Sequence, residues 1–197
     1  MEPAGNEPNE VRGRRRLPHL LSLIASLTLL LPVGCLLTSP PADAYVHFGC
    51  RQPSNTYVGV DRAGMTNYYA NRMQESMTAW NSKQNYVSFI NAAFPAQDVL
   101  AFSASYQDGW LGLTTFSCSG TTMQNVSVKM NQRLLGMAGK TDAQIKQVGT
   151  HELGHTLGLD HTNKTCTASV MVGTACIGTV GPYPYWDDLN GVQDWGY

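Results

Sequence analysis

Three features of the sequence predict an α+β domain. In the first two thirds of the chain, segments that alternate polar and apolar residues predict strands. One segment in the same region has apolar residues at helical spacing and predicts a helix. A second helical segment follows them, and the last third is rich in turn-forming residues. The length of 197 residues, 43% of them hydrophobic, suits one compact domain with a short extension.

The first 44 residues are expected to form a signal peptide. Four arginines within residues 12–16 precede a leucine-rich apolar run at 20–31, and the A-x-A triplet at 42–44 is a cleavage signal. Tyr45 is then the first residue of the mature protein, and 45–197 is the expected catalytic domain.

A membrane or lipid anchor is the alternative interpretation of this segment. Apolar residues continue to Leu37, but Pro32 and Gly34 interrupt them and leave the run short for a membrane span. Cys35 is a candidate for lipidation, although Pro32 is unfavourable at the start of a lipidation sequence. The arginines leave the choice between the Sec and twin-arginine export routes open.

Strands and one long helix are predicted in the first part of the mature chain. The strands are expected at 56–61, 86–90, 99–106, 109–116 and 126–130. A helix is expected at 65–80, where an apolar stripe of helical spacing is interpreted as core that packs on the sheet. The stripe consists of Met65, Tyr69, Met73, Met77 and Trp80. Residues 117–122 (SCSGTT) are expected to form a turn or loop.

A second helix is predicted from Thr141, which can form a capping box with Gln144. It runs into HELGHTLGLDH, in which His151 and His155 project from one helical face and can place imidazole nitrogens on a single Zn²⁺. Glu152 flanks that face. It is placed to accept a proton from the water that the metal activates rather than to bind the metal.

Gly158 and His161 complete this pattern. A residue without Cβ can take the left-handed conformation that ends a helix, so His161 can return as the third ligand. Three neutral imidazoles leave the fourth tetrahedral position open, which is typical of a catalytic zinc site. Five positions must match at fixed offsets, so a chance occurrence has odds of roughly one in ten thousand.

The motif resembles that of the metzincin metalloproteases and is most similar to the matrixin branch. The resemblance implies a methionine in a tight turn beneath the metal, and ASVMVG offers Met171. WDDLNGVQDWGY at 186–197 is similar to the matrixin C-terminal helix, while MTAWNS, DGWLGLTTF and VSVKMNQ are more loosely similar to matrixin segments. We therefore expect a metzincin-like domain with a mixed twisted sheet, a long packing helix, a zinc-binding active-site helix and a C-terminal helix after the methionine turn.

The resemblance also implies the substrate contacts, which are Gly112, Leu113, Pro182 and Tyr183. The first two lie in the strand at 109–116, where an extended peptide would add at the sheet edge. The last two lie in a segment that in matrixins walls the pocket for the side chain just after the scissile bond. A rigid linker is the alternative for that segment.

The chain departs from matrixins around the methionine turn. Cys166 and Cys176 bracket Met171 symmetrically, a feature that resembles the snapalysin proteases, whose third zinc ligand is an aspartate. Here Asp160 precedes the expected position and His161 fills it, so His161 is assigned as the ligand. The matrixin resemblance further implies that Asp188 supports the methionine turn.

Cysteine usage fits an exported protein. Removal of the signal peptide leaves Cys50, Cys118, Cys166 and Cys176, an even number that predicts two disulfides in one of three connectivities. The ten-residue separation favours Cys166 with Cys176, which leaves Cys50 with Cys118.

These observations predict a secreted zinc endopeptidase that is a monomer and acts on proteins or peptides. One catalytic Zn²⁺ is the expected cofactor, and calcium binding stays open. A net charge of −1 gives no basic surface for nucleic acid, and membrane contact is expected only through the signal segment. The alternatives are a zinc amidase acting on cell-wall peptides and a non-catalytic zinc-stabilised binding module, in which Glu152 would have no role.

Overall fold

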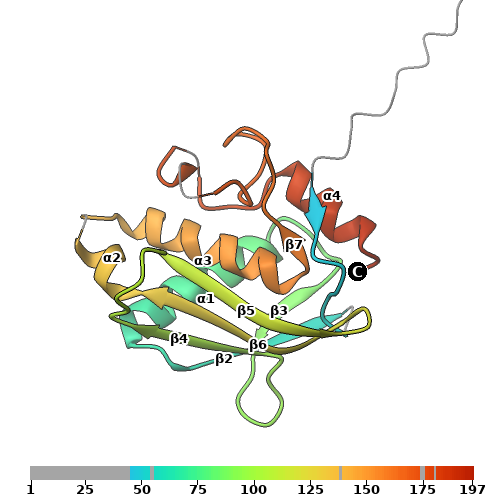
Figure 1. Cartoon of the computed structure of the whole chain (residues 1–197), viewed down its shortest axis with the longest axis horizontal. Helices are drawn as coiled ribbons and strands as arrows, with labels where there is room; N and C mark the ends of the chain where they lie inside the picture. Colours follow the sequence, from blue (N-terminus) through green and yellow to red (C-terminus); the bar gives the residue numbers. More distant parts are fainter. Residues whose placement is uncertain (1–44, 54–55, 138, 174–175, 180) are drawn as a thin grey trace, which may run out of the picture. The chain divides into compact units, whose positions relative to one another are not determined.

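The computed structural model describes residues 45–197 apart from 54–55, 138, 174–175 and 180 (Figure 1). The predicted signal peptide and its cleavage site therefore lie outside the described residues. In the described ranges, no helix is both long and apolar enough to span a membrane.

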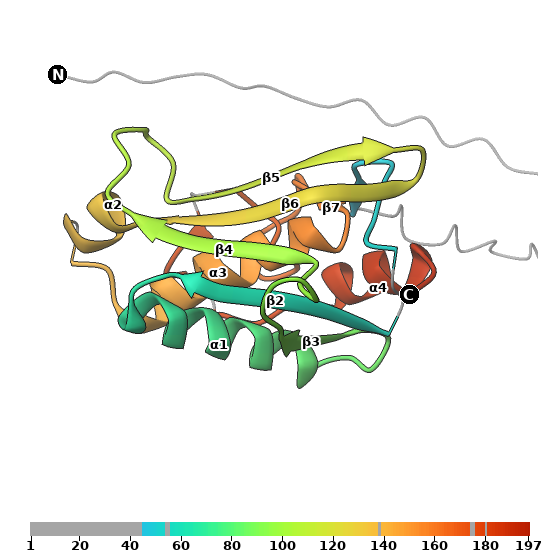
Figure 2. The ribbon, with the colours of Figure 1, turned by 90° about the horizontal axis from the view of Figure 1, so that it is seen from below.

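A five-stranded sheet forms the centre of the fold, with strand order β3-β2-β4-β6-β5. Its strands are β2 (Tyr57–Gly64), β3 (Ser88–Asn91), β4 (Val99–Ala104), β5 (Gly112–Ser119) and β6 (Thr122–Asn131). The β2 strand is parallel to β3 and β4, and β4 is parallel to β6, whereas β5 is antiparallel to β6 (Figure 2). The predicted mixed sheet and its five strands are confirmed, and β5 lies at one edge.

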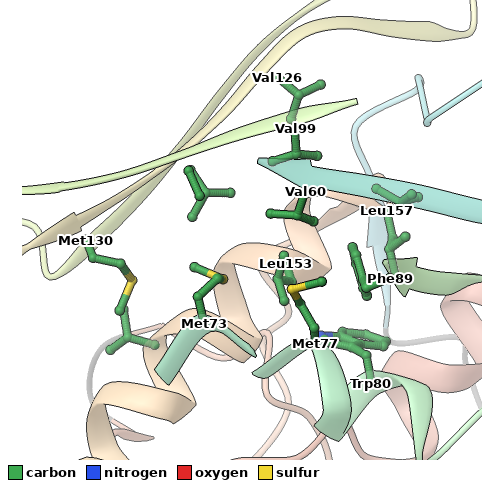
Figure 3. Packing of buried hydrophobic residues seen from close by; sticks show 14 of the residues in the cluster. Val60, Met73, Met77, Trp80, Phe89, Val99, Val126, Met130, Leu153 and Leu157 are labelled. Atoms are coloured by element: carbon green, nitrogen blue, oxygen red, sulfur yellow. The ribbon is translucent and has the colours of Figure 1, made fainter. Parts of the chain in front are cut away.

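Two long helices, α1 (Asn67–Asn81) and α3 (Asp142–Thr156), pack on the same face of this sheet (Figure 1). Their apolar residues meet the inward side chains of the strands in one core (Figure 3). Trp80 is fully buried, and its indole N–H donates to the carbonyl of Thr150 at 2.9 Å, which joins α1 to α3. The predicted apolar stripe is thus core, and each fully buried large apolar side chain contributes about 1.5–3 kcal/mol.

The predicted loop at 117–122 is wrong, because β5 continues to Ser119 and β6 begins at Thr122. Only the tip of this hairpin turns, where Gly120 has a positive φ of 59°. Serine and threonine are frequent in turns, but threonine is also enriched in strands, and strand propensity depends strongly on context.

Three short elements were not predicted, because each is too short to show a period. They are β1 (Val46–His47), β7 (Leu159–Asp160) and α2 (Gln132–Met137). The β1 strand pairs antiparallel with β7, so residues 46–47 lie beside the segment that precedes His161.

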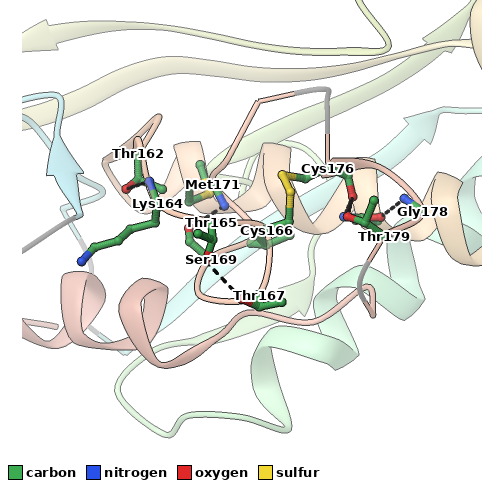
Figure 4. Close-up of a disulfide and its surroundings, with 12 residues drawn as sticks. Thr162, Lys164, Thr165, Cys166, Thr167, Ser169, Met171, Cys176, Gly178 and Thr179 are labelled. Carbon is green, nitrogen blue, oxygen red and sulfur yellow. Dashed lines mark hydrogen bonds between the residues drawn. A yellow bond between two sulfur atoms is a disulfide. The ribbon is translucent and has the colours of Figure 1, made fainter. Parts of the chain in front are cut away.

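The C-terminal third is mostly irregular, as predicted, until α4 (Trp186–Asp194). Both favoured disulfides are confirmed. Cys50 is bonded to Cys118, and Cys166 is bonded to Cys176 across the turn that carries Met171 (Figure 4).

Candidate metal centre

Helix α3 carries the first two predicted ligands. Thr141 and Gln144 form the predicted capping box at its start, and His151 and His155 lie one turn apart near its end. Gly158 then adopts a φ of 91°, where a Cβ would also collide with the indole of Trp195. A glycine is therefore required for the chain to leave the helix at this point.

The chain returns through β7 and places His161 opposite the helix. One ring nitrogen from each of His151, His155 and His161 lies within 4.8 Å of the others, and Nε2 of His151 is 3.0 Å from Nε2 of His161. Among the described residues, no other group of three or more His, Cys, Asp or Glu side chains converges in this way. Asp160 stays outside the cluster, and its carboxylate accepts a hydrogen bond from the backbone N–H of His161 at 2.6 Å.

The hydrogen bonds of two histidines determine which ring nitrogen faces the centre. Nδ1 of His151 is 2.8 Å from the carbonyl of Val170, and Nδ1 of His155 is 2.7 Å from the carbonyl of Leu159. A carbonyl can only accept, so each Nδ1 carries the proton and each Nε2 directs a lone pair inward. Convergent imidazole lone pairs with backbone partners behind them fit a zinc ion.

Burial keeps the imidazoles of His151 and His155 neutral. Desolvation, reinforced by the neighbouring His155, lowers the pKa of His151 to about 3. Desolvation also lowers the pKa of His155 to about 4. Both rings therefore offer lone pairs to a metal at neutral pH without first losing a proton.

Glu152 points from α3 toward the edge strand. Its side chain is only 5% exposed, and burial raises its pKa to about 7, although hydrogen bonds from Thr114 act in the opposite direction. The Thr114 hydroxyl is 2.7 Å from Oε2 of Glu152 and 3.0 Å from its backbone carbonyl. The carboxyl group is thus close to the histidines without belonging to their cluster.

Met171 packs against α3 and is 2% exposed. A Cβ on Gly154 would collide with the Met171 sulfur, so this glycine allows the methionine to approach the helix. The turn is held by Asp188, which accepts hydrogen bonds from the backbone N–H groups of Val170 at 2.8 Å and Met171 at 3.4 Å. The support that the sequence expected from Asp188 is therefore present.

A cavity of about 490 Å³ opens beside the histidines. Gly112 and Leu113, two of the four predicted substrate contacts, line it. Other described residues that line the cavity include Phe48, Trp110, Gln147, Val148, Val172, Gly173 and Ile177.

Pro182 and Tyr183, the other two predicted contacts, are not among the lining residues. The Tyr183 ring instead packs under the ammonium of Lys146, 4.5 Å from the ring centroid, and the Pro182 carbonyl accepts from the Thr150 hydroxyl at 3.3 Å. The two predicted substrate contacts in this segment stay a prediction, and the wall of the cavity nearer the methionine turn includes Val172, Gly173 and Ile177.

That wall depends on Gln147, which the sequence reasoning missed. Its amide donates to the carbonyl of Cys176 at 3.0 Å and accepts from the N–H of Gly178 at 2.8 Å, which fixes Ile177 between them. The position of Gln147 in the sequence could have indicated this role, because Gln147 precedes His151 by one helical turn and shares its helical face.

Comparisons with known proteins agree with this geometry. A family model described as metallo-peptidase family M12 matches residues 45–183. A solved structure described as the GM1-bound form of the ECX AB5 holotoxin is similar, with 14% identity, a TM-score of 0.52, and coverage of 78% of this chain and 88% of that chain. At this identity the likeness shows the fold alone. No curated protein matches the chain.

Proposed function

The chain belongs to metallo-peptidase family M12, and on this basis we propose that it is a secreted zinc-dependent endopeptidase with one catalytic Zn²⁺. The observation that carries the proposal is the convergence of His151, His155 and His161 beside a buried carboxyl group, at the rim of a cavity. A purely structural zinc site would need neither the carboxyl group nor the cavity.

His151, His155 and His161 would hold the zinc ion, which supplies a Lewis acid that polarises a peptide carbonyl and makes water reactive at neutral pH. Glu152 accepts the proton of the attacking water and passes it to the amine that leaves. Its burial supports this role, because a carboxyl group with a pKa near neutrality can both take and return a proton.

The edge strand β5 is the proposed binding site for substrate. Within the part of the chain that the structure describes, strand β5 pairs only with β6, and Gly112, Leu113 and Thr114 line the cavity. An extended peptide can therefore add to this edge through backbone hydrogen bonds, which bind peptides with little regard to sequence.

Among the metzincin metalloproteases, we propose that the chain is most similar to the matrixin branch. The support comes from His161, which joins the ligand cluster while Asp160 does not, and from the bonds of Asp188 to the methionine turn. The Cys166–Cys176 bridge around that turn is a feature that resembles snapalysins.

Two disulfides support export, because disulfides persist in oxidising compartments. The proposed route is removal of residues 1–44 as a signal peptide, which leaves Tyr45 as the first residue. N-terminal sequencing of the protein recovered from culture medium tests this proposal.

The activity test incubates the mature protein with an unfolded protein substrate, with and without a metal chelator. Internal cleavage that the chelator abolishes is expected. A protein that binds one zinc ion per chain and cleaves neither unfolded protein nor cell-wall peptide would be a non-catalytic module, and cleavage of cell-wall peptide alone would favour the amidase.

A further inference from the structure

The carboxylate of Glu152 accepts a hydrogen bond from the hydroxyl of Thr114 at 2.7 Å, and the Thr114 backbone also favours its ionised form. The two residues lie on different elements, β5 and α3, and are 38 positions apart in the sequence. We propose that Thr114 is a positioning residue that holds the Glu152 carboxylate in the orientation needed for proton transfer. This inference rests on the proposed peptidase function.

The backbone of Thr114 is itself well fixed. It pairs with Val128 in the antiparallel β5–β6 ladder, so its side chain has a defined direction toward α3. The hydroxyl lies within hydrogen-bonding distance of both Oε2 and the backbone carbonyl of Glu152. The contact with the backbone carbonyl links the Thr114 hydroxyl to α3 at Glu152, the residue whose side chain the hydroxyl orients.

Gly112 allows the strand to come this close. It lies two residues before Thr114 and therefore on the same face of β5. A Cβ at Gly112 would be 2.5 Å from Oε1 of Glu152 and 2.7 Å from a methyl group of Val148. The carboxylate thus lies across Gly112, with Oε2 held by Thr114.

The two carboxylate oxygens of Glu152 therefore have different roles. The Thr114 hydroxyl has one proton to donate, and a bond to an ionised oxygen is stronger than one to a neutral carbonyl. In this proposal the hydroxyl holds Oε2, and Oε1, which lies against Gly112 in the cavity lining, accepts the proton. Fixing the acceptor before substrate arrives removes its reorientation from the barrier.

The substitution Thr114→Val isolates this function, because valine keeps the shape and the strand propensity of threonine but lacks the hydroxyl. Loss of a hydrogen bond to a charged group should lower kcat by about 10- to 100-fold, while KM stays within a factor of about two. Thr114→Ser keeps the hydroxyl and should restore most of the rate.

Thr115→Val is the matched control. Thr115 is the next residue of β5, but it is exposed, and its hydroxyl is 2.8 Å from that of Ser127 rather than near Glu152. The same atom is removed from the same strand, so a general effect on β5 would appear in both variants. Zinc content and thermal unfolding are measured for each variant.

A Glu152→Gln background separates positioning from a structural role. If Thr114 acts through the Glu152 carboxylate, Thr114→Val should add little to the loss already caused by Glu152→Gln. Equal losses in both backgrounds, or a kcat for Thr114→Val within a factor of about two of wild type, would overturn the proposal.

Binding of acetohydroxamate provides a readout that does not depend on peptide hydrolysis. This ligand chelates zinc and needs a neighbouring carboxylate to accept its proton, so Thr114→Val should weaken its binding about tenfold. If the wild type binds it without cleaving peptides, the peptidase proposal fails while the Thr114 inference is still decided. Unchanged affinity in Thr114→Val would reject the inference.

Discussion

Asp188 is connected to His151, a proposed zinc ligand, through a single residue, Val170. The Asp188 carboxylate accepts the Val170 N–H at 2.8 Å, and the Val170 carbonyl is 2.8 Å from Nδ1 of His151. The acid in α4 therefore orients a ring in α3 by fixing the peptide between them. Such outer hydrogen bonds set the direction and basicity of a histidine ligand.

Asp188→Asn should therefore lower both stability and zinc affinity. The carboxylate accepts from Ser169, Val170, Met171 and Tyr185, and an amide must direct its NH₂ group at some of these donors. We expect a loss of about 3 kcal/mol in the free energy of unfolding and a 10- to 100-fold weaker zinc affinity.

Denaturant unfolding and competition with a zinc-binding dye measure these two effects. Asp194→Asn is the control, because this acid lies in the same helix but is exposed, where its carboxylate accepts from the Tyr45 hydroxyl at 2.7 Å. If both variants bind zinc as tightly as the wild type, Asp188 does not act through His151.

The ionisation of Asp188 predicts a pH dependence of stability. Burial raises its pKa to about 6, despite the hydrogen bonds that favour the charged form. A carboxyl group whose pKa is higher in the folded than in the unfolded state binds its proton more tightly when folded. Its stabilising contribution is therefore present below about pH 4, is lost as the pH rises to about 6, and is constant above that.

Unfolding of the wild type and of Asp188→Asn between pH 4 and 8 checks the sign. The wild type should lose stability relative to the variant as the pH rises to about 6, after which the two curves should run parallel. A relative gain of the wild type over this interval would mean that its hydrogen bonds outweigh burial.

The identity of the third ligand is tested by two neighbouring substitutions. His161→Ala should weaken zinc binding far more than Asp160→Ala, because only His161 places a ring nitrogen in the cluster. Zinc retained per chain after dialysis measures the difference. Loss of zinc from Asp160→Ala alone would show that the site uses an aspartate, as in snapalysins.

Glu152→Ala should retain zinc and lose peptide hydrolysis. The substitution removes the proton acceptor but none of the three histidines, so the rate should fall by about 10² to 10⁴. Rates must be compared at equal zinc content. A fully metallated variant with wild-type turnover would exclude Glu152 from the reaction.

The convergence of the three histidines was predictable from the sequence because its determinants are local. His151 and His155 share a helical face by spacing alone, and Gly158 and the Thr141 cap follow from backbone rules. The five strands were also visible, since their side chains alternate.

Contacts between distant segments were not predictable in this way. The bond from Thr114 to Glu152 depends on how β5 crosses α3, and the pairing of β1 with β7 involves two residues on each side. Pro182 and Tyr183 are not among the cavity-lining residues for the same reason. They contact Lys146 and Thr150, which no local pattern relates to them.

In the proposed function, zinc held by the three histidines is responsible for peptide hydrolysis. The direct measurement is a titration of the metal-free mature protein with zinc, in which bound metal and the rate of peptide cleavage are followed together. We predict a rate that rises in proportion to bound zinc and saturates at one ion per chain, with no response from His155→Ala. Cleavage by the metal-free protein, or full zinc binding without cleavage, would contradict the claim.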